Sequence, residues 1–227
     1  SVVLSASRKD SPAALQALEE LCRAYWYPLY AHVRRTGYSP ADAEDLTQSF
    51  FARLIEKDWL GVADRERGRF RSFLLGALKH FLANEWDKMS AQKRGGQLKF
   101  ISMDALVGED RLRHEPIDRG TPDQEFDRRW ALTLLDAVLA RLEREYFENG
   151  KAAMFEALKS SLGADRSGLD YPQLSQMLGL SEGAVRVAVH RLRHRYRELL
   201  REMIAQTVTT QAEVEDELRQ LFAALNQ

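Results

Sequence analysis

The sequence predicts an all-α protein with two helical domains, a flexible linker between them and a C-terminal helical extension. Apolar residues recur three and four positions apart along most of the 227 residues, which is the period of one buried helix face. No segment alternates apolar and polar residues as a half-buried strand does. A hydrophobic content of 44% and a charged content of 30% suit a helix-rich protein with real cores.

The first domain, residues 1–96, is expected to hold three helices. They cover residues 12–35, 41–57 and 69–88. Ser11 precedes Pro12 as an N-cap precedes the first helical position, and Pro28 should kink or split the helix that follows.

The rest of the chain is expected to form a linker, a second domain and an extension. Their bounds are 97–128, 129–205 and 206–227. Gly108, Pro116 and Gly120 interrupt the linker, which shows no strong period and indicates irregular structure. Helical spacing resumes near Pro122, breaks at Asn149-Gly150, and continues with helices at 152–162 and around 213–225.

Residues 171–200 predict a helix-turn-helix. A short helix ends at Gly179, which adopts positive φ without extra cost, and Ser181 then stands where an N-cap is expected. The second helix has one apolar stripe, formed by Val185, Val189, Leu192, Tyr196 and Leu199. Its other side is cationic, since residues 186–197 hold five arginines, two histidines and no acid. This combination suits a helix that enters the major groove; an ordinary solvated basic helix in a bundle is the plainer alternative.

Composition restricts the classes of function open to the chain. With 33 Lys and Arg against 34 Asp and Glu, the formal net charge is −1, so nucleic-acid binding requires local segregation of charge. The single cysteine, Cys22, excludes an internal disulfide and leaves no cysteine cluster for a metal. No run of residues is long enough for a membrane span and the first residues do not form a signal peptide, so we expect a cytoplasmic protein.

In this order, the segments resemble the bacterial sigma factors of RNA polymerase, in the compact extracytoplasmic-function (ECF) type of the sigma-70 superfamily. Residues 39–57, SPADAEDLTQSFFARLIEK, are similar to the sigma domain 2 helix that docks on the clamp helices of the polymerase β′ subunit. An apolar face beside an acidic-polar face also suits docking to another helical protein. The resemblance implies this contact for Asp42, Glu44, Asp45, Leu46, Gln48 and Phe51.

Residues 67–96, RGRFRSFLLGALKHFLANEWDKMSAQKRGG, are similar to the family's segments that melt the promoter and read its −10 element. Open DNA requires stacking surfaces for unpaired bases and cations for the single-strand backbone. Phe73 and Phe81 stand at helical spacing and are better explained as core. The candidates for DNA contact are Arg69, Arg71, Lys79, His80, Asn84, Trp86, Lys88, Lys93 and Arg94.

The helix-turn-helix resembles sigma domain 4, which reads the −35 element and grips the polymerase β flap. The DNA contacts implied here are Ser181, Arg186, Val187, Ala188, His190, Arg191, Arg193, His194 and Arg195. Val187 and Ala188 depart from the family, where polar and basic residues are common. We expect both to point away from the apolar stripe, where they can touch thymine methyls but cannot hydrogen-bond base edges. Phosphate contacts and DNA shape then have to supply more of the affinity and specificity.

The resemblance implies a sigma factor that binds core RNA polymerase and directs promoter-specific initiation, with no cofactor and no catalytic activity. Promoter DNA and core polymerase are the implied partners, together with an anti-sigma factor or another regulator. His190 and His194 have zinc-binding spacing, but arginines surround them and no glutamate base lies between. Two alternatives stay open: a helix-turn-helix regulator that binds duplex DNA without polymerase, and a sigma-like adaptor that has lost melting.

The extension is acidic and amphipathic, with four acids and one arginine in residues 207–227. Its apolar face carries Val214, Leu218, Leu221 and Leu225. Such a helix can pack as an ordinary terminal helix on domain 4, dock a partner, or lie against domain 2 as an internal brake that masks a basic face. The brake hypothesis expects promoter binding to rise when residues 207–227 are deleted.

Overall fold

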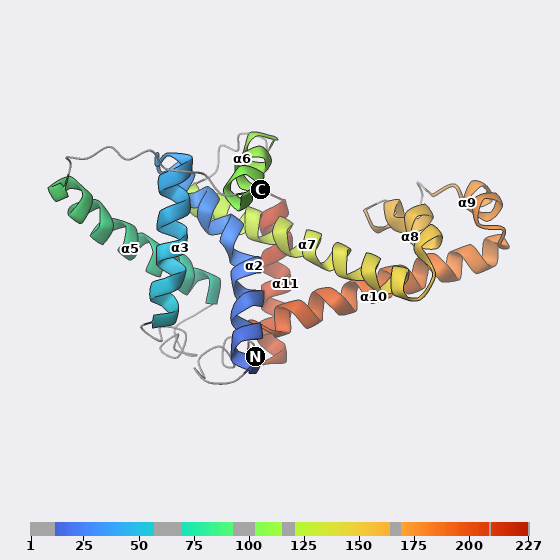
Figure 1. The fold of residues 1–227 in the computed structure, drawn as a ribbon. Helices are drawn as coiled ribbons and strands as arrows, with labels where there is room; N and C mark the ends of the chain where they lie inside the picture. The colour runs from blue at the N-terminus through green and yellow to red at the C-terminus, as the bar shows by residue number, and fades with distance from the viewer. Residues whose placement is uncertain are drawn as a thin grey trace. The chain divides into compact units, whose positions relative to one another are not determined.

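A computed structural model describes residues 12–56, 70–92, 103–114, 121–163, 169–208 and 210–226. Every regular element in these ranges is a helix (Figure 1), so the all-α prediction is confirmed. None of the described helices has both the length and the apolar character needed to cross a membrane.

The chain divides into two compact units, but their boundary is not at the expected linker. Unit 1 comprises residues 1–133 and 205–227, and unit 2 comprises residues 134–204. One boundary therefore falls inside the helix α7 (Pro122–Glu148), and the C-terminal extension belongs to the first unit. Thr121 caps α7 where helical structure was expected to resume: its hydroxyl accepts from Gln124 N at 3.3 Å, and its own N–H donates to Gln124 Oε1 at 2.8 Å.

Unit 1 is built on α2 (Pro12–Arg35), α3 (Pro40–Glu56) and α5 (Phe70–Gln92). Its core is aromatic and aliphatic; buried members include Leu29, Tyr30, Phe50, Leu54, Leu78 and Phe81. Pro28 was expected to kink or split this helix; it does not split it, because α2 continues through that residue as one helix. The tight turn after α2 uses Gly37 at φ 101°, a conformation that favours glycine.

The helix α6 (Met103–His114) stands where an irregular linker was expected. Glu109 fixes it to α2, accepting from the Tyr30 hydroxyl at 2.9 Å and from Arg34 Nη2 at 3.0 Å. Short helices are marginal alone and depend on packing. The glycine within this segment suggested a break, yet Gly108 lets α6 approach the rings of Tyr30 and Trp26 closely. The segment is therefore helical because of tertiary contacts, which the periodicity of its sequence does not reveal.

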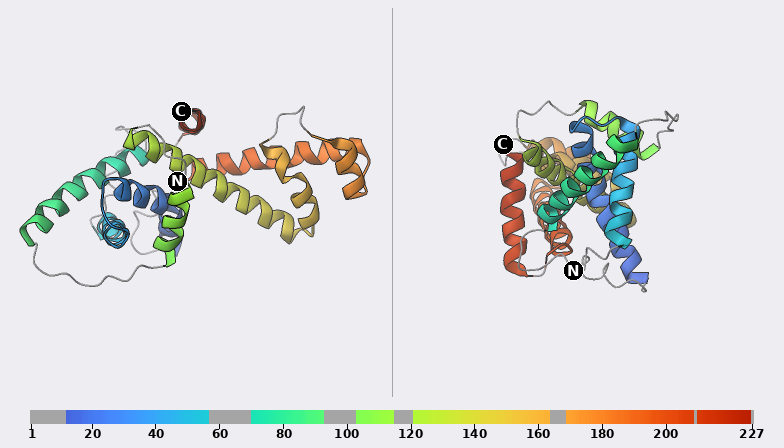
Figure 2. Two further views of the ribbon diagram at one scale, coloured as in Figure 1. Left: turned by 90° about the horizontal axis from the view of Figure 1, so that it is seen from above. Right: turned by 90° about the vertical axis from the view of Figure 1, so that its left-hand side faces the viewer.

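The last helix of unit 1 is α11 (Gln211–Leu225), which runs on the opposite side of the unit from α3 (Figure 2). A capping box starts it: Thr210 accepts from Glu213 N at 3.3 Å, and Thr210 N donates to Glu213 Oε2 at 3.1 Å. Its expected apolar face is buried at Val214, Leu218 and Leu221.

Unit 2 contains the remainder of α7, then α8 (Ala152–Leu158), the 3₁₀ turn η1 (Lys159–Leu162), α9 (Tyr171–Leu178) and α10 (Glu182–Ala205). The expected helix at 152–162 is thus α8 followed by η1. Gly150 at φ 66° makes the turn after α7, as the Asn-Gly pair predicted. The buried side chains that hold these helices together include Val138, Leu142, Phe155, Leu158, Val185 and Leu192.

Alanine at two helical glycines tests the packing of α6. Nothing lies within 4 Å of a Cβ added at Gly76, so Gly76→Ala should stabilise the protein by about 0.5–1 kcal/mol through helix propensity. A Cβ at Gly108 would stand 3.1 Å from a Tyr30 ring carbon, so Gly108→Ala should gain less or destabilise. Urea unfolding measures the difference; equal gains at both positions would contradict the contact of α6 with α2.

Candidate nucleic-acid interface

The helix-turn-helix is formed by α9 and α10 in unit 2. The Asp170 carboxylate caps α9 by accepting from Gln173 N at 3.0 Å, and Gly179 turns the chain at φ 63°. The Ser181 hydroxyl accepts from Ala184 N at 3.3 Å at the start of α10. Val185, Val189 and Leu192 are buried behind this helix as predicted.

The N-terminal half of α10 has an exposed side made of basic residues and one valine. Val187 is 49% exposed, and His190, Arg191 and His194 lie on the surface beside it. The Arg186 guanidinium stacks 4.0 Å from the centre of the Tyr171 ring, which orients this cation at the junction with α9. Together these residues form a compact cationic surface with an apolar centre, which we call the α10 face: Arg186, Val187, His190, Arg191 and His194.

Ala188 is not fully on that surface. It lies three residues after Val185 and four before Leu192, so the helical period puts it beside the buried stripe, and its side chain is half-buried. Ala188 is therefore less exposed than Val187, and its contact with DNA stays a prediction.

Arg193 and Arg195 bind oxygen atoms of other elements within unit 2. Arg193 donates to the Ser161 carbonyl from Nε at 2.9 Å and from Nη2 at 2.7 Å. Arg195 makes a bidentate contact with Glu145, at 2.8 Å on both sides, and a further bond of 3.0 Å with Glu202. Because both arginines flank the buried stripe of α10, their guanidinium groups hold α7, η1 and α10 together and are not presented to a phosphate as expected.

The Glu145–Arg195 pair is part of an ion-pair network that neutralises positive charge in the later half of α10. Glu198 and Glu202 both contact Arg195, and Arg141 Nη2 donates to Glu202 at 2.8 Å. The hydrogen bond from Arg195 lowers the pKa of Glu145 below its ordinary value. Sequence reasoning missed this network, although the acids at 198 and 202, three and seven residues after Arg195, were a signal for it.

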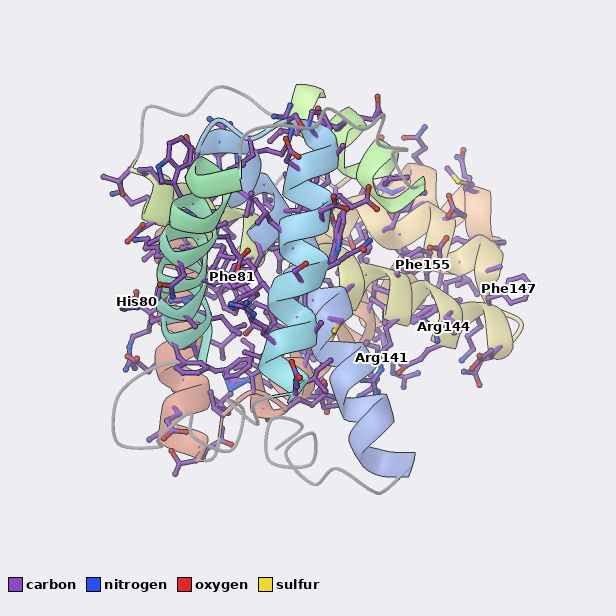
Figure 3. All side chains as sticks on the ribbon, turned by 60° about the vertical axis from the view of Figure 1, so that its left-hand side comes forward. His80, Phe81, Arg141, Arg144, Phe147 and Phe155 are labelled. Atoms are coloured by element: carbon purple, nitrogen blue, oxygen red, sulfur yellow. The ribbon has the colours of Figure 1, made fainter. Side chains whose placement is uncertain are left out.

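The structure places the residues expected to read the −10 element in different surroundings. His80, Asn84 and Trp86 are exposed on α5, and Figure 3 shows His80 pointing out of unit 1 while Phe81 points inward. Trp86 is 61% exposed and meets the Tyr38 ring edge-on, with centroids 6.4 Å apart. Lys79 is exposed too, but its ammonium binds Asp123 of α7 at 2.6 and 2.8 Å. Lys88 belongs to α5, and Arg69, Lys93 and Arg94 lie outside the described residues.

Arg71 was expected to contact DNA, but its side chain is buried and only 2% exposed. Its guanidinium stacks 4.3 Å from the centre of the Trp130 ring. Nε lies 3.1 Å from Asp127, and Nη1 lies 3.3 Å from Glu217 of α11. These are ion-pair distances, yet neither nitrogen makes a hydrogen bond, so the angles are poor. In this conformation Arg71 cannot reach a DNA strand.

The six residues expected to dock on polymerase are split by the packing of α3. Asp45 and Gln48 are exposed, and Asp42 is partly exposed, with an oxygen that accepts from the Ser39 hydroxyl at 2.7 Å. Glu44, Leu46 and Phe51 are buried within unit 1. The exposed acidic-polar face of α3 is therefore narrower than the motif implied, because three of the six residues are buried in the packing of unit 1.

Comparison with known proteins does not assign this chain to a family. No protein-family model and no solved structure matches this chain. The candidate site therefore stands on its own residues: an exposed cationic face on α10, an exposed aromatic-polar row on α5, and a narrow acidic face on α3. Among the described residues, no three His, Cys, Asp or Glu side chains form a group able to hold a metal ion.

The Glu145–Arg195 pair gives unit 2 a predictable acid sensitivity. Because the folded-state pKa of Glu145 is lowered from 4.5, the pair stabilises the fold above that pH, and its contribution is lost as the pH falls through the lower folded value. Glu145→Gln should lower stability at neutral pH and remove this part of the acid dependence. The effect should be modest because both side chains are partly exposed. Thermal unfolding as a function of pH measures it.

Glu148→Gln is the matched control, because Glu148 is exposed on the same helix three residues further on. It should leave the pH profile unchanged. Superimposable profiles for the wild type and Glu145→Gln would show that the pair does not contribute to the stability of unit 2.

Proposed function

We propose that the protein is a sigma factor of the ECF type, which binds core RNA polymerase in the cytoplasm and directs promoter-specific transcription initiation without catalytic activity of its own. The observation that carries the proposal is the helix-turn-helix with its exposed α10 face. A cationic, solvent-facing row on a second helix after a glycine turn has the chemistry of a major-groove reader.

The order of the three segments supports sigma activity over plain duplex binding. The acidic face of α3 precedes the aromatic-polar row of α5, and both precede the helix-turn-helix. Trp86 offers an exposed indole on which an unpaired base can stack, which a reader of duplex DNA does not need. Asp45 and Gln48 offer a polar docking surface on a separate helix of unit 1.

On the α10 face, the direct readout available is limited. Val187 can contact a thymine methyl, while Arg186, His190, Arg191 and His194 provide phosphate contacts or donors to guanine. Since Arg193 and Arg195 are engaged inside unit 2, fewer cations reach the backbone than the arginine count indicates. Specificity at −35 would then depend strongly on Arg186, His190 and Arg191.

Transcription with purified core polymerase tests the proposal. On promoter-sized genomic fragments, adding the protein should produce transcripts with defined starts that core polymerase alone does not make. Asp45→Arg should reduce their yield while leaving duplex binding by unit 2 intact, because Asp45 lies on α3 in unit 1. Duplex binding without transcripts would favour a regulator, and polymerase binding without initiation would favour an adaptor.

Arg191 tests the α10 face itself. Arg191→Ala should weaken duplex binding and flatten the plot of log affinity against log salt by about one unit, the expected loss for one phosphate contact. Arg201→Ala, exposed near the other end of α10, is the control and should leave the slope unchanged. An unchanged slope for Arg191→Ala would remove Arg191 from the phosphate contacts.

A further inference from the structure

The contact between α11 and Arg71 is the feature of unit 1 that the proposed function does not use. The chain leaves unit 1 after Thr133, forms unit 2, and returns at Ala205 to add α11 to the first unit. The Tyr25 hydroxyl is hydrogen-bonded to Trp130 and to Thr207, which precedes α11. Burial, reinforced by the nearby Glu217 carboxylate, raises the pKa of Tyr25. Arg71 and Tyr25 thus lie beside Glu217 of α11, and Trp130 contacts both of them.

Glu217 is an exception to the pattern of α11. The helix buries Val214, Leu218, Leu221 and Ala224, as an amphipathic terminal helix should, but Glu217 is on the same side and only 5% exposed. A helix that served only to complete the core would carry an apolar residue there, since a buried ion pair rarely improves on apolar packing. Its carboxylate lies 3.3 Å from Arg71 Nη1, so the acid pairs α11 with a particular cation of unit 1.

The cation it meets is an arginine from the basic-aromatic segment. Residues 65–99 hold nine Lys and Arg against three acids, and α11 brings four acids to this unit. Arg71 Nε and Nη1 face two carboxylates as ion pairs without hydrogen bonds. A buried guanidinium with such poor geometry pays much of its desolvation cost without full compensation, which makes the contact with α11 weaker than its buried area suggests.

We propose that α11 is a releasable internal cover of unit 1, in which the Glu217 carboxylate occupies the Arg71 guanidinium that a nucleic-acid phosphate takes when α11 leaves. Carboxylate and phosphate oxygens both bind guanidinium groups, so one can replace the other. Because α11 lies on the side of the unit opposite α3 (Figure 2), its release leaves the acidic face of α3 unchanged. The DNA half of this proposal rests on the proposed function, whereas the release of α11 does not.

Hydrogen exchange on the full chain tests the release. Glu217→Gln keeps the shape of the side chain and removes its charge, so amides of α11 should exchange at least about tenfold faster while those of α3 keep their rates. Glu215→Gln is the matched control: it makes the same chemical change on the same helix, at a residue whose carboxylate accepts an exposed hydrogen bond from Gln211. Unchanged exchange of α11 in Glu217→Gln would overturn the proposal.

Binding of a mixed-sequence single-stranded DNA oligonucleotide tests the competition. Glu217→Gln should bind the oligonucleotide about tenfold more tightly than the wild type does, and adding Arg71→Ala should cancel the gain. In the wild type, a saturating oligonucleotide should accelerate exchange in α11. This last measurement needs no variant, so it decides the question even if Glu217→Gln also loosens α3.

The possible results of these experiments contradict different parts of the proposal. Faster exchange in Glu217→Gln with oligonucleotide affinity unchanged would overturn the competition, and so would wild-type α11 exchange that is insensitive to bound DNA. Absence of oligonucleotide binding by either chain would overturn it too. Transcription with core polymerase reports on the proposed function independently, so a chain that initiates transcription but keeps α11 protected would contradict the cover and leave the sigma assignment standing.

Discussion

One helix, α7, has to satisfy two hydrophobic cores, and the division of the chain depends on this constraint. Its first part buries Phe126 and Trp130 in unit 1, and its later part buries Val138 and Leu142 in unit 2. The described chain therefore has no irregular linker at this boundary: unit 2 begins at Leu134 within α7 and ends at Ile204 within α10.

The positive charge available at the surface of this protein depends on which arginines are buried, and not only on how many the sequence contains. In α10, the helical period decides which arginines face solvent: Arg191 is outward, while Arg193 and Arg195 flank the buried stripe and bind oxygens of their own unit. In α5, Arg71 lies inside unit 1 although it belongs to the most basic segment of the chain. A binding surface inferred from arginine number alone is consequently too large in both places.

The elements that sequence predicted well are those with local causes. Gly179 and Ser181 set the turn and the cap of the helix-turn-helix through their own backbone and hydroxyl chemistry, and both act as expected. The helix α6 was missed because its stability comes from Glu109 meeting Tyr30 and Arg34, some 75 to 79 residues away. The burial of Arg71 was missed for the same reason, since Glu217 is remote in sequence and nothing in the local pattern pairs them.

The acid within the apolar face of α11 connects these observations. A helical extension with an acidic character had three plausible positions, and the structure selects unit 1, the unit that carries the basic-aromatic segment. Apolar packing of Val214 and Leu221 accounts for attachment but not for choice of partner, because many apolar surfaces would accept such a helix. Glu217 supplies the choice: placed elsewhere it would be a buried charge without a cation, which costs several kcal/mol. The same dependence makes the attachment conditional, since an anion that binds Arg71 competes with Glu217 for this guanidinium.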